Sequence, residues 1–316
     1  MRGIWFTAKG VAAFQEEPEP ELAPDRVLVR TIYSGLSNGT ERNKLMGGNY
    51  HKGSYPDRIG YQHVSEVVGR GEGVTKFDVG DVVFSATYPG HVPMFTLKES
   101  DLVVKLEPAM RRPAATMMGV ASVSMHVARI SGVGVGDRVL VVGGGLIGQF
   151  AVQASRAMGA RVTLVDRNAD RLELARELGA DHAVDNTDEA AWNILKDMPR
   201  FSVCLECSGG DVLDAVIGTG WGGGVLARGA RMVFVAGRDR TDFSFNAASS
   251  CRLVTYSSAH FVQDDLDQVY RLATKGVIRL DELVRDVVPI DDAICVYDTL
   301  RDDKRKLLGT VFDWRQ

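Results

Sequence analysis

Cysteine is scarce in this chain of 316 residues, and the first 200 residues contain none. The four cysteines are Cys204, Cys207, Cys251 and Cys295. Cys204 and Cys207 have the spacing of a redox pair, but thioredoxin-type pairs lie at a helix N-terminus. Here the surrounding sequence, Phe-Ser-Val-Cys-Leu-Glu-Cys-Ser-Gly, predicts a buried strand that runs into a glycine turn. We therefore expect both residues to be small buried side chains.

Long apolar runs and blocks of basic residues are also missing. No run approaches the roughly 20 residues that a membrane-spanning helix needs. The net charge of −4 and the scattered Lys and Arg residues do not suggest a nucleic-acid-binding surface. The N-terminus lacks the layout of a signal peptide. We expect a cytoplasmic protein without nucleic-acid or membrane partners, long enough for two domains.

One glycine-rich stretch carries a specific signal. Residues 139–142 are β-branched or leucine and predict a strand, after which Gly143, Gly145 and Gly148 form Gly-x-Gly-x-x-Gly. An amphipathic helix and a second strand follow, and that strand ends at Asp166. The glycines allow a tight turn, the approach of a pyrophosphate and close helix–strand packing, and the helix N-terminus favours phosphate. A glycine-rich turn without ligand is the less favoured interpretation.

The residue at the end of the second strand bears on the choice of cofactor. The carboxylate of Asp166 accepts hydrogen bonds from ribose hydroxyls and repels a 2′-phosphate, which favours NAD over NADP. Arg167 weakens this preference, because an arginine there suits a 2′-phosphate. The other predicted cofactor-binding residues begin the helix or follow later strands: Leu146, Ile147, Cys207, Ser208 and Gly237.

The order of predicted elements divides the chain into three regions. Residues 1–118 are rich in short alternating strands, which suggests antiparallel sheet or a partly open barrel. Residues 119–284 alternate strands and helices and predict a doubly wound parallel sheet of the α/β class, a Rossmann nucleotide domain. Residues 285–316 return to short β-like segments. We expect the first and last regions to form one catalytic domain that the nucleotide domain interrupts.

Four segments resemble the medium-chain dehydrogenase/reductase superfamily, which includes alcohol, polyol and threonine dehydrogenases and quinone reductases. They are residues 33–41 (Tyr-Ser-Gly-Leu-Ser-Asn-Gly-Thr-Glu), 59–63 (Ile-Gly-Tyr-Gln-His), 67–81 and 136–145. The resemblance covers nearly the whole chain and implies a GroES-like catalytic domain, hydride transfer in a cleft between the domains, and a homodimer or homotetramer. Residues 34–41 also resemble a zinc-less branch that includes the bacteriochlorophyllide hydroxyethyl dehydrogenases.

The sequence departs from the zinc-dependent members at their ligand positions. Where those members have a cysteine and a His–Glu pair, this chain has Ser37, Tyr61 and Gln62. Residues 115–118 offer no third ligand, and residues 86–100 lack the cysteines of a structural-zinc lobe. Catalytic zinc takes three N, S or O side chains, so we expect no zinc. A less favoured alternative is a metal site rebuilt from His51, His63, His91 and Glu41.

Without zinc, hydrogen-bond donors or a proton relay have to stabilise the developing alkoxide. The candidate catalytic residues are Ser37, Asn38, Thr40, Glu41, Tyr61 and His63. Tyr61 is either a donor to the substrate oxygen or a hydrogen-bonded core tyrosine. Thr40 is either a relay hydroxyl or a turn cap, and Glu41 either a base or an ion-pair partner. Alternation along an extended segment places Tyr61 and His63 on one face.

These observations favour an NAD(H)-dependent, zinc-independent dehydrogenase or ketone reductase acting on a small molecule. A polyol, sugar or cyclitol is the preferred substrate, because unpaired polar groups in a site reject apolar molecules. Two alternatives stay open. One is an enone or quinone reductase of the zinc-less branch, whose members mostly use NADPH. The other is a non-catalytic NAD(H)-binding sensor.

Overall fold

The computed structural model describes residues 1–51, 53–188, 190–258 and 260–315. The chain forms two compact units. Unit 1 comprises Met1–Gly119, Val262–Thr274 and Leu280–Gln316, and unit 2 comprises Val120–Phe261 and Lys275–Arg279. This division differs from the expected second boundary at residue 284, because helix α8 (Gln263–Thr274) groups with unit 1.

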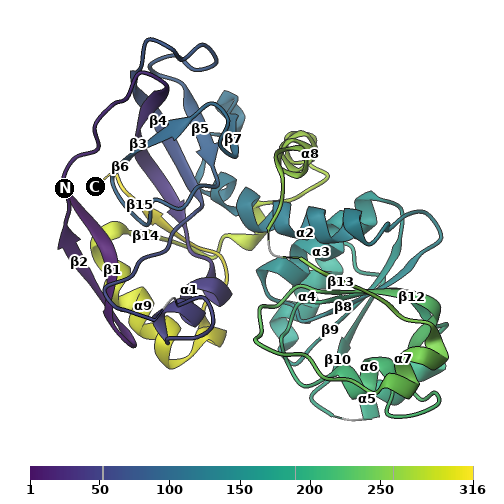
Figure 1. Cartoon of the computed structure of the whole chain (residues 1–316). Helices are drawn as coiled ribbons and strands as arrows, with labels where there is room; N and C mark the ends of the chain where they lie inside the picture. The colour runs from purple at the N-terminus through teal and green to yellow at the C-terminus, as the bar shows by residue number, and fades with distance from the viewer. Residues whose placement is uncertain (52, 189, 259, 316) are drawn as a thin grey trace. The chain divides into compact units, whose positions relative to one another are not determined.

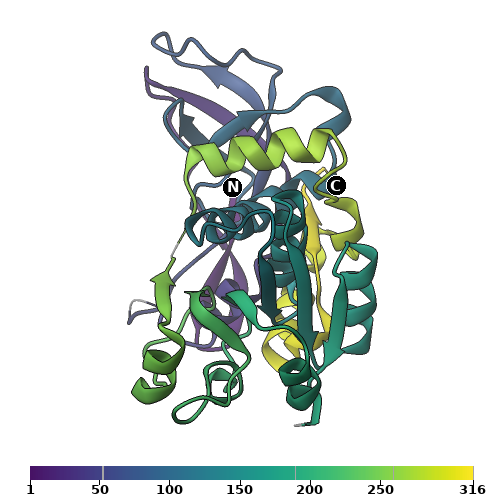
Figure 2. The same cartoon turned by 90° about the vertical axis from the view of Figure 1, so that its right-hand side faces the viewer.

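Side-chain hydrogen bonds explain why helix α8 groups with the first unit. The Gln263 amide accepts from the backbone N–H of Val103 at 3.2 Å and donates to its carbonyl at 3.1 Å. The Tyr270 hydroxyl accepts from the backbone N–H of Glu107 at 3.0 Å. These contacts attach α8, seen along its length in Figure 2, to the first residue of strand β7 (Val103–Lys105) and to the segment that follows this strand.

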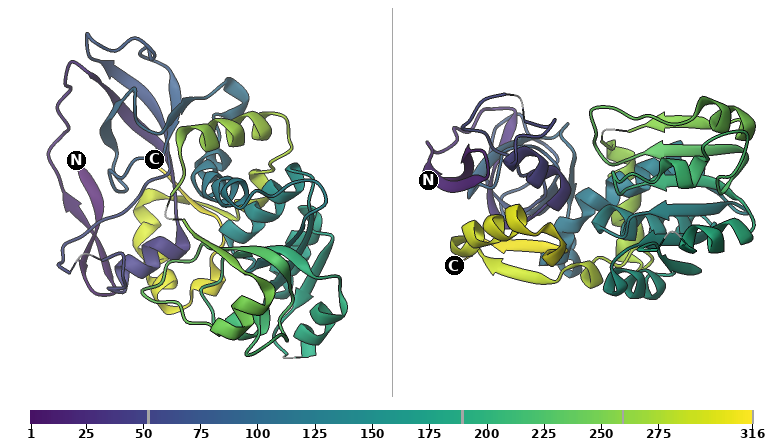
Figure 3. Two further views of the ribbon diagram at one scale, coloured as in Figure 1. Left: turned by 45° about the vertical axis from the view of Figure 1, so that its right-hand side comes forward. Right: turned by 90° about the horizontal axis from the view of Figure 1, so that it is seen from below.

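Unit 2 contains the predicted doubly wound sheet. Its strands are β8 (Arg138–Val142), β9 (Arg161–Asp166), β10 (His182–Asp185), β11 (Phe201–Glu206), β12 (Leu226–Phe234) and β13 (Val254–Ser257). They pair in the order β10-β9-β8-β11-β12-β13, and every pair is parallel (Figure 3). In such a sheet the order reverses between the first and fourth strands, and ligands bind outside the carboxyl ends of the strands at that point. The fold prediction is confirmed.

Helices cover both faces of this sheet. They are α2 (Met118–Ile130), α3 (Leu146–Ala157), α4 (Ala169–Glu177), α5 (Ala190–Asp197), α6 (Leu213–Ile217) and α7 (Phe245–Cys251). Helix α3 lies on one face, and α5, α6 and α7 lie on the other (Figure 1), where they share one apolar cluster with the strands. Two of these helices have typical end residues: Gly159 follows α3 with a φ of +90°, and the Asn168 side chain caps α4 by accepting from the N–H of Arg171.

Unit 1 is built on antiparallel strands. Its strands are β1 (Arg2–Ala8), β2 (Val11–Glu16), β3 (Arg26–Gly35), β4 (His63–Arg70), β5 (Val82–Ser85), β6 (Met94–Lys98), β7, β14 (Asp286–Pro289) and β15 (Thr310–Asp313). Strands β1 and β2 form a hairpin, and the larger sheet has the order β14-β15-β3-β4-β5-β7, with β6 also on β3. Alternate residues of β3, such as Val27 and Val29, are buried in its core.

Two longer helices besides α8 belong to unit 1, α1 (Asn38–Leu45) and α9 (Ala293–Asp302), which lie side by side (Figure 1). Short 3-10 turns occupy Pro108–Met110, Pro113–Met117, Asp281–Leu283, Ile290–Asp292 and Lys304–Lys306. Strands β14 and β15 are the short β-segments expected after residue 285, but helix α9 between them was not expected. Ala293, Val296, Tyr297 and Leu300 are buried at helical spacing, and this stripe packs α9 against the core.

None of the helices in the described ranges combines the length and the apolar character that a membrane span requires.

Candidate active site

The fingerprint loop of unit 2 has the geometry that its glycines predict. Gly143 has a φ of +98°, a backbone conformation that other residues rarely adopt. A Cβ atom on Gly148 would lie 1.8 Å from the carbonyl oxygen of Gly143, so helix α3 approaches the loop too closely for any side chain there. Gly145 is the N-cap of α3, and nothing lies within 4 Å of a Cβ placed on it. The open space and the N–H groups of Leu146 and Ile147 at the helix start suit a pyrophosphate.

Asp166 lies at the carboxyl end of β9, directly beside this loop. Its Oδ2 accepts from the backbone N–H of Gly144 at 2.6 Å, and its Oδ1 accepts from that of Asn168 at 2.9 Å. A carboxylate has further acceptor positions, so both oxygens can still receive ribose hydroxyls. Arg167 follows on the exposed surface. The residues present thus fit a dinucleotide at the N-terminus of α3.

An ion pair that was not expected from the sequence lies at the carboxyl ends of strands β11 and β12. The buried Glu206 carboxylate accepts from the backbone N–H groups of Ser208 and Gly209, each at 2.9 Å, and pairs with Arg238. Through these bonds it fixes the turn that contains Cys207 and Ser208, while Gly237 follows the end of β12. In the sequence, this ion pair could have been recognised from an acidic residue at the end of one predicted strand and an arginine shortly after the next.

The two cysteines of the Cys-x-x-Cys segment belong to strand β11 and the turn after it. Burial raises the pKa of the Cys204 thiol to about 12, and it also raises the pKa of Cys207. Thiols are nucleophiles and redox partners as thiolates, so neither residue has that character here. Cys204 is buried, as expected, whereas Cys207 is only partly buried.

In unit 1, the structure brings the hydroxyl groups of Ser37 and Tyr61 together. The Tyr61 hydroxyl donates to Ser37 Oγ at 3.2 Å, and both side chains are buried. Burial raises the pKa of the Tyr61 phenol, which keeps its proton available for donation. The ring of the exposed Tyr88 lies 5.3 Å from the Tyr61 ring.

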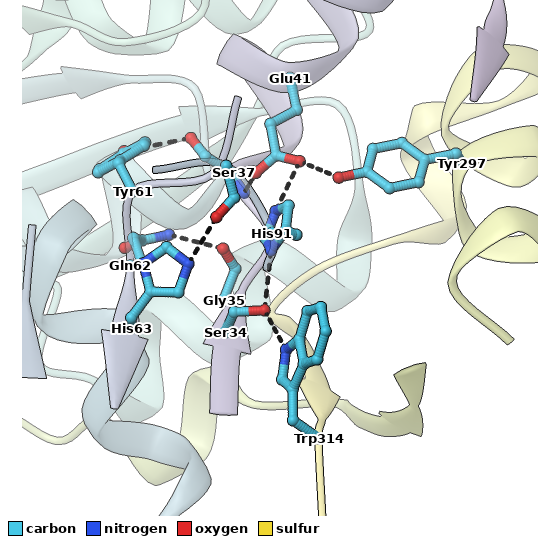
Figure 4. Close-up of polar contacts among 11 residues, drawn as sticks. Ser34, Gly35, Ser37, Glu41, Tyr61, Gln62, His63, His91, Tyr297 and Trp314 are labelled. Atoms are coloured by element: carbon cyan, nitrogen blue, oxygen red, sulfur yellow. Dashed lines mark hydrogen bonds and ion pairs between the residues drawn. The ribbon is translucent and has the colours of Figure 1, made fainter. Parts of the chain in front are cut away.

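Beside this pair, a buried polar cluster surrounds Glu41 (Figure 4). We call it the Glu41 cluster, and it consists of Ser34, Ser37, Glu41, His91, Tyr297 and Trp314. Burial and the Glu41 carboxylate raise the pKa of Tyr297 well above its usual value. Glu41 and His91 were candidate residues from the sequence, whereas Ser34, Tyr297 and Trp314 were not. The two C-terminal residues carry no local signal, because they reach the site only through the tertiary fold.

The remaining predicted catalytic residues have different surroundings. Asn38 donates to the carbonyl of Leu307 at 2.9 Å, and its Oδ1 is buried without a hydrogen-bond partner in the described structure. His63 Nε2 is 3.0 Å from the Gly90 carbonyl, so this nitrogen carries the proton and Nδ1 is an acceptor. Burial and the neighbouring His91 lower the pKa of His63 to about 3. Thr40 is half-buried on helix α1.

The residues at the family's zinc positions do not fit the metal. Ser37 and Tyr61 bond to each other, and the Gln62 amide is directed at the carbonyl of Gly35 at 3.4 Å. Alcohol, phenol and amide groups are not the thiolate, imidazole and carboxylate ligands that Zn²⁺ takes. His51, part of the alternative metal set, is 3.1 Å from Asp57 and stacks on a tyrosine. Within the residues that the structure describes, no three His, Cys, Asp or Glu side chains form a metal-binding group.

Two family models match this chain. One is the alcohol dehydrogenase GroES-like domain, which matches residues 23–103, and the other is the zinc-binding dehydrogenase domain, which matches residues 147–275. Among curated relatives, sorbitol dehydrogenase of Halalkalibacterium halodurans is 26% identical, over 66% of this chain and 70% of that protein. Sorbitol dehydrogenase 1 of Saccharomyces cerevisiae is 25% identical, over 92% and 91%.

Solved structures agree on the fold. An alcohol dehydrogenase from Thermus sp. ATN1 superimposes with a TM-score of 0.85 at 21% identity, over 100% of both chains. A zinc-binding dehydrogenase from Sinorhizobium meliloti bound to NADP has a TM-score of 0.83 at 18% identity, over 99% of each chain. Together the two domain matches, the parallel nucleotide sheet and the relatives, which are oxidoreductases acting on CH–OH groups, support the medium-chain dehydrogenase/reductase superfamily for this chain.

Proposed function

We propose that this protein is an NAD(H)-dependent, zinc-independent dehydrogenase that interconverts a secondary alcohol and a ketone. The hydrogen-bonded hydroxyl pair of Ser37 and Tyr61 carries the proposal, since it occupies the positions where zinc-dependent members have metal ligands. The fingerprint loop and Asp166 would hold NAD(H), which would supply the hydride acceptor for oxidation of the alcohol and the hydride donor for reduction of the ketone. The chain's own residues handle the proton on the substrate oxygen.

Proton transfer proceeds through the hydroxyl pair in both directions. During reduction, Ser37 passes its proton to the substrate oxygen as the alkoxide develops and takes up the proton of Tyr61, and a proton from water restores the Tyr61 hydroxyl. During oxidation the protons move the opposite way. Donors held in place before the reaction stabilise developing negative charge more strongly than water does, because they need no reorganisation. The high pKa of Tyr61 keeps the pair protonated and able to donate.

Asp166 supports NAD as the preferred cofactor. Its carboxylate is fixed by two backbone N–H groups at the end of β9, where ribose hydroxyls bind in this fold. A 2′-phosphate would bring two further negative charges toward a carboxylate that these two hydrogen bonds hold in place. The relative with bound NADP shares only 18% of its sequence with this chain, so it bears on the fold and not on this preference.

Two buried acceptors support a polyol, sugar or cyclitol as substrate. Asn38 Oδ1 and His63 Nδ1 are buried and have no hydrogen-bond partner in the described structure. Buried acceptors without partners cost about 1–3 kcal/mol each, a cost that a substrate hydroxyl removes and an apolar substrate does not. Relatives named sorbitol dehydrogenase and D-xylulose reductase support the same substrate class.

A nicotinamide-absorbance screen tests the function. NAD and NADP are offered with polyols, cyclitols, sugars and secondary alcohols, and NADH and NADPH with ketones and enones. We expect NAD-linked oxidation of a polyhydroxy compound. NADPH-linked reduction of enones would instead indicate an enone or quinone reductase, and tight NADH binding without turnover would indicate a sensor.

Two variants test the hydroxyl pair. Ser37→Ala and Tyr61→Phe each remove one hydroxyl, and we expect kcat to fall by about 10²–10⁴-fold, the usual contribution of a positioned proton donor. NADH affinity serves as the control, since both residues belong to unit 1 and the fingerprint loop belongs to unit 2. Wild-type kcat in both variants would refute the assigned role.

We also propose that the protein forms a homodimer through the edge of its nucleotide sheet. Strand β13 is the last strand in the order and has only β12 as a neighbour in the described chain, and Val254 on it is 45% exposed. An unpaired edge strand is a template for a second copy. Light scattering of the wild type and of Val254→Pro tests this, and a dimer that survives the proline would contradict it.

A further inference from the structure

Glu41 holds both backbone polar groups of Ser37. The Glu41 N–H donates to the Ser37 carbonyl at 2.8 Å, which is the first hydrogen bond of helix α1. The Glu41 carboxylate reaches back, and its Oε1 accepts from the Ser37 N–H at 2.8 Å. This reciprocal arrangement resembles a capping box, but the acidic residue lies one position later than usual. The backbone of Ser37 is therefore fixed on both sides by one residue.

The other carboxylate oxygen of Glu41 is fixed from two distant parts of the chain. Tyr297, on helix α9, donates its hydroxyl to Oε2 at 2.5 Å, and His91 Nε2 lies 3.2 Å from the same oxygen (Figure 4). The Glu41 and His91 side chains are fully buried, and Tyr297 is 1% exposed. Hydrogen bonds to an ionised group are stronger than those between neutral groups, especially away from water.

The protons of the Glu41 cluster can be assigned from the groups that only donate. The Trp314 indole N–H donates to Ser34 Oγ at 2.9 Å. The Ser34 proton then points to His91 Nδ1, 2.8 Å away, because no other acceptor for it is found in the described structure. His91 is left with its proton on Nε2, directed at Glu41. Three donors, from Ser37, Tyr297 and His91, thus converge on one carboxylate.

We propose that Glu41 is a positioning residue for the catalytic hydroxyl of Ser37, and that Tyr297 and the His91–Ser34–Trp314 chain hold Glu41 in place. The inference rests on the proposed function, because it assigns the cluster's purpose through Ser37. It explains why a buried polar cluster is retained next to the apolar core of unit 1, whose Phe6 and Phe312 rings pack against the Tyr297 ring. A charge buried only for stability is weakly supported on physical grounds, since apolar replacements are often equally stable.

The test compares Tyr297→Phe and Glu41→Gln with the matched control Tyr33→Phe. Tyr33 is also a buried tyrosine of unit 1, on β3 next to Ser34, and lies outside the Glu41 cluster. Amide hydrogen exchange of Ser37 measures the positioning contact directly, because the exchanging N–H is the group that donates to the Glu41 carboxylate. kcat, its solvent isotope effect and NADH affinity are measured on the same proteins.

We expect Ser37 exchange to accelerate at least tenfold in Tyr297→Phe and Glu41→Gln, kcat to fall about tenfold or more, and the solvent isotope effect on kcat to rise. NADH affinity stays at the wild-type value, and Tyr33→Phe matches the wild type in all four. Unchanged exchange of the Ser37 amide in both variants overturns the proposal, whether or not kcat falls. Should Glu41→Gln fail to fold, Tyr297→Phe decides, since it keeps the ring that packs in the core.

The two proposals fail in different ways. A wild-type protein without turnover on any alcohol or ketone refutes the proposed function, while the exchange of the Ser37 amide still decides whether Glu41 and Tyr297 position this residue. An active wild type whose Tyr297→Phe and Glu41→Gln variants keep both kcat and Ser37 exchange leaves the function intact and refutes the positioning role.

Discussion

Alanine substitutions at two glycines of the fingerprint loop, Gly145 and Gly148, distinguish a role in packing from a role in cofactor binding. A methyl group added at Gly148 would lie 1.8 Å from the Gly143 carbonyl oxygen and 2.9 Å from its carbon. These are backbone atoms, so the contact is relieved only by moving helix α3 or strand β8. A methyl group added at Gly145 meets nothing within 4 Å, and its φ of −69° is allowed for alanine. The same substitution therefore has different consequences three residues apart.

The magnitudes follow from the contacts. Overpacking of this kind costs about 1–3 kcal/mol, and in a unit of roughly 150 residues each kcal/mol lowers Tm by about 2–4 °C. We expect Gly148→Ala without ligand to melt about 2–12 °C below the wild type. In Gly145→Ala the reduced entropy of the unfolded chain offsets a poorer N-cap, so its Tm without ligand stays within about 2 °C.

With NADH present, we expect Gly145→Ala to differ from the wild type, although its Tm without ligand does not. The added methyl group occupies the space beside the helix N-terminus that a pyrophosphate needs, and we expect NADH affinity to fall at least tenfold, about 1.4 kcal/mol. Thermal melts with and without NADH, together with fluorescence titration, measure both quantities. Wild-type NADH affinity in both variants would refute dinucleotide binding at this loop. A wild-type Tm in Gly148→Ala would refute the packing argument.

Three further predictions concern cofactor choice, metal and pH. Asp166→Ala should lower the preference for NADH over NADPH at least tenfold in binding titrations, and an unchanged ratio would show that this carboxylate does not hold the ribose. Chelators should leave activity intact, and elemental analysis should find well below one zinc per chain, whereas stoichiometric zinc would contradict the proposed mechanism. Because the pKa of His63 is lowered to about 3, the unfolded chain binds a proton there that the folded chain does not, between about pH 6.5 and 3. Stability should therefore be lost as pH falls through this window, by up to about 1.4 kcal/mol per pH unit, and acid unfolding of His63→Gln should show a shallower dependence.

Much of unit 2 could be predicted from the sequence because its signals are local. The glycine fingerprint, the cap at Asn168 and the apolar strands each depend on residues within one or two turns of chain. Helix α9 was missed although its buried positions repeat with helical spacing. Its flanking strands β14 and β15 are short and β-branched, and they made the whole C-terminal region look like sheet.

The candidate site in unit 1 was only partly predictable. Ser37, Glu41 and Tyr61 were visible because they lie in segments that resemble the superfamily. The partners of Glu41 were not visible, since Tyr297 is separated from it by 256 residues of sequence and is brought near only when α9 packs beside α1. The metal alternative treated histidines as ligands, whereas hydrogen bonds to Ser34, Asp57 and Gly90 occupy three of them: His91, His51 and His63.

Replacing a metal by hydroxyl groups changes what the surrounding fold has to provide. A zinc ion is positioned by three short ligand bonds and contributes several kcal/mol of charge stabilisation by itself. A serine hydroxyl has one rotatable proton, and a donor misplaced by an ångström loses much of its effect. In this chain the reciprocal hydrogen bonds between Ser37 and Glu41 fix the serine backbone, and the Tyr61 hydroxyl donates to Ser37 Oγ. In the proposed zinc-independent mechanism, the positioning that ligand bonds give a metal enzyme would come from hydrogen bonds, so the buried Glu41 cluster and the hydroxyl groups at the family's ligand positions have one explanation.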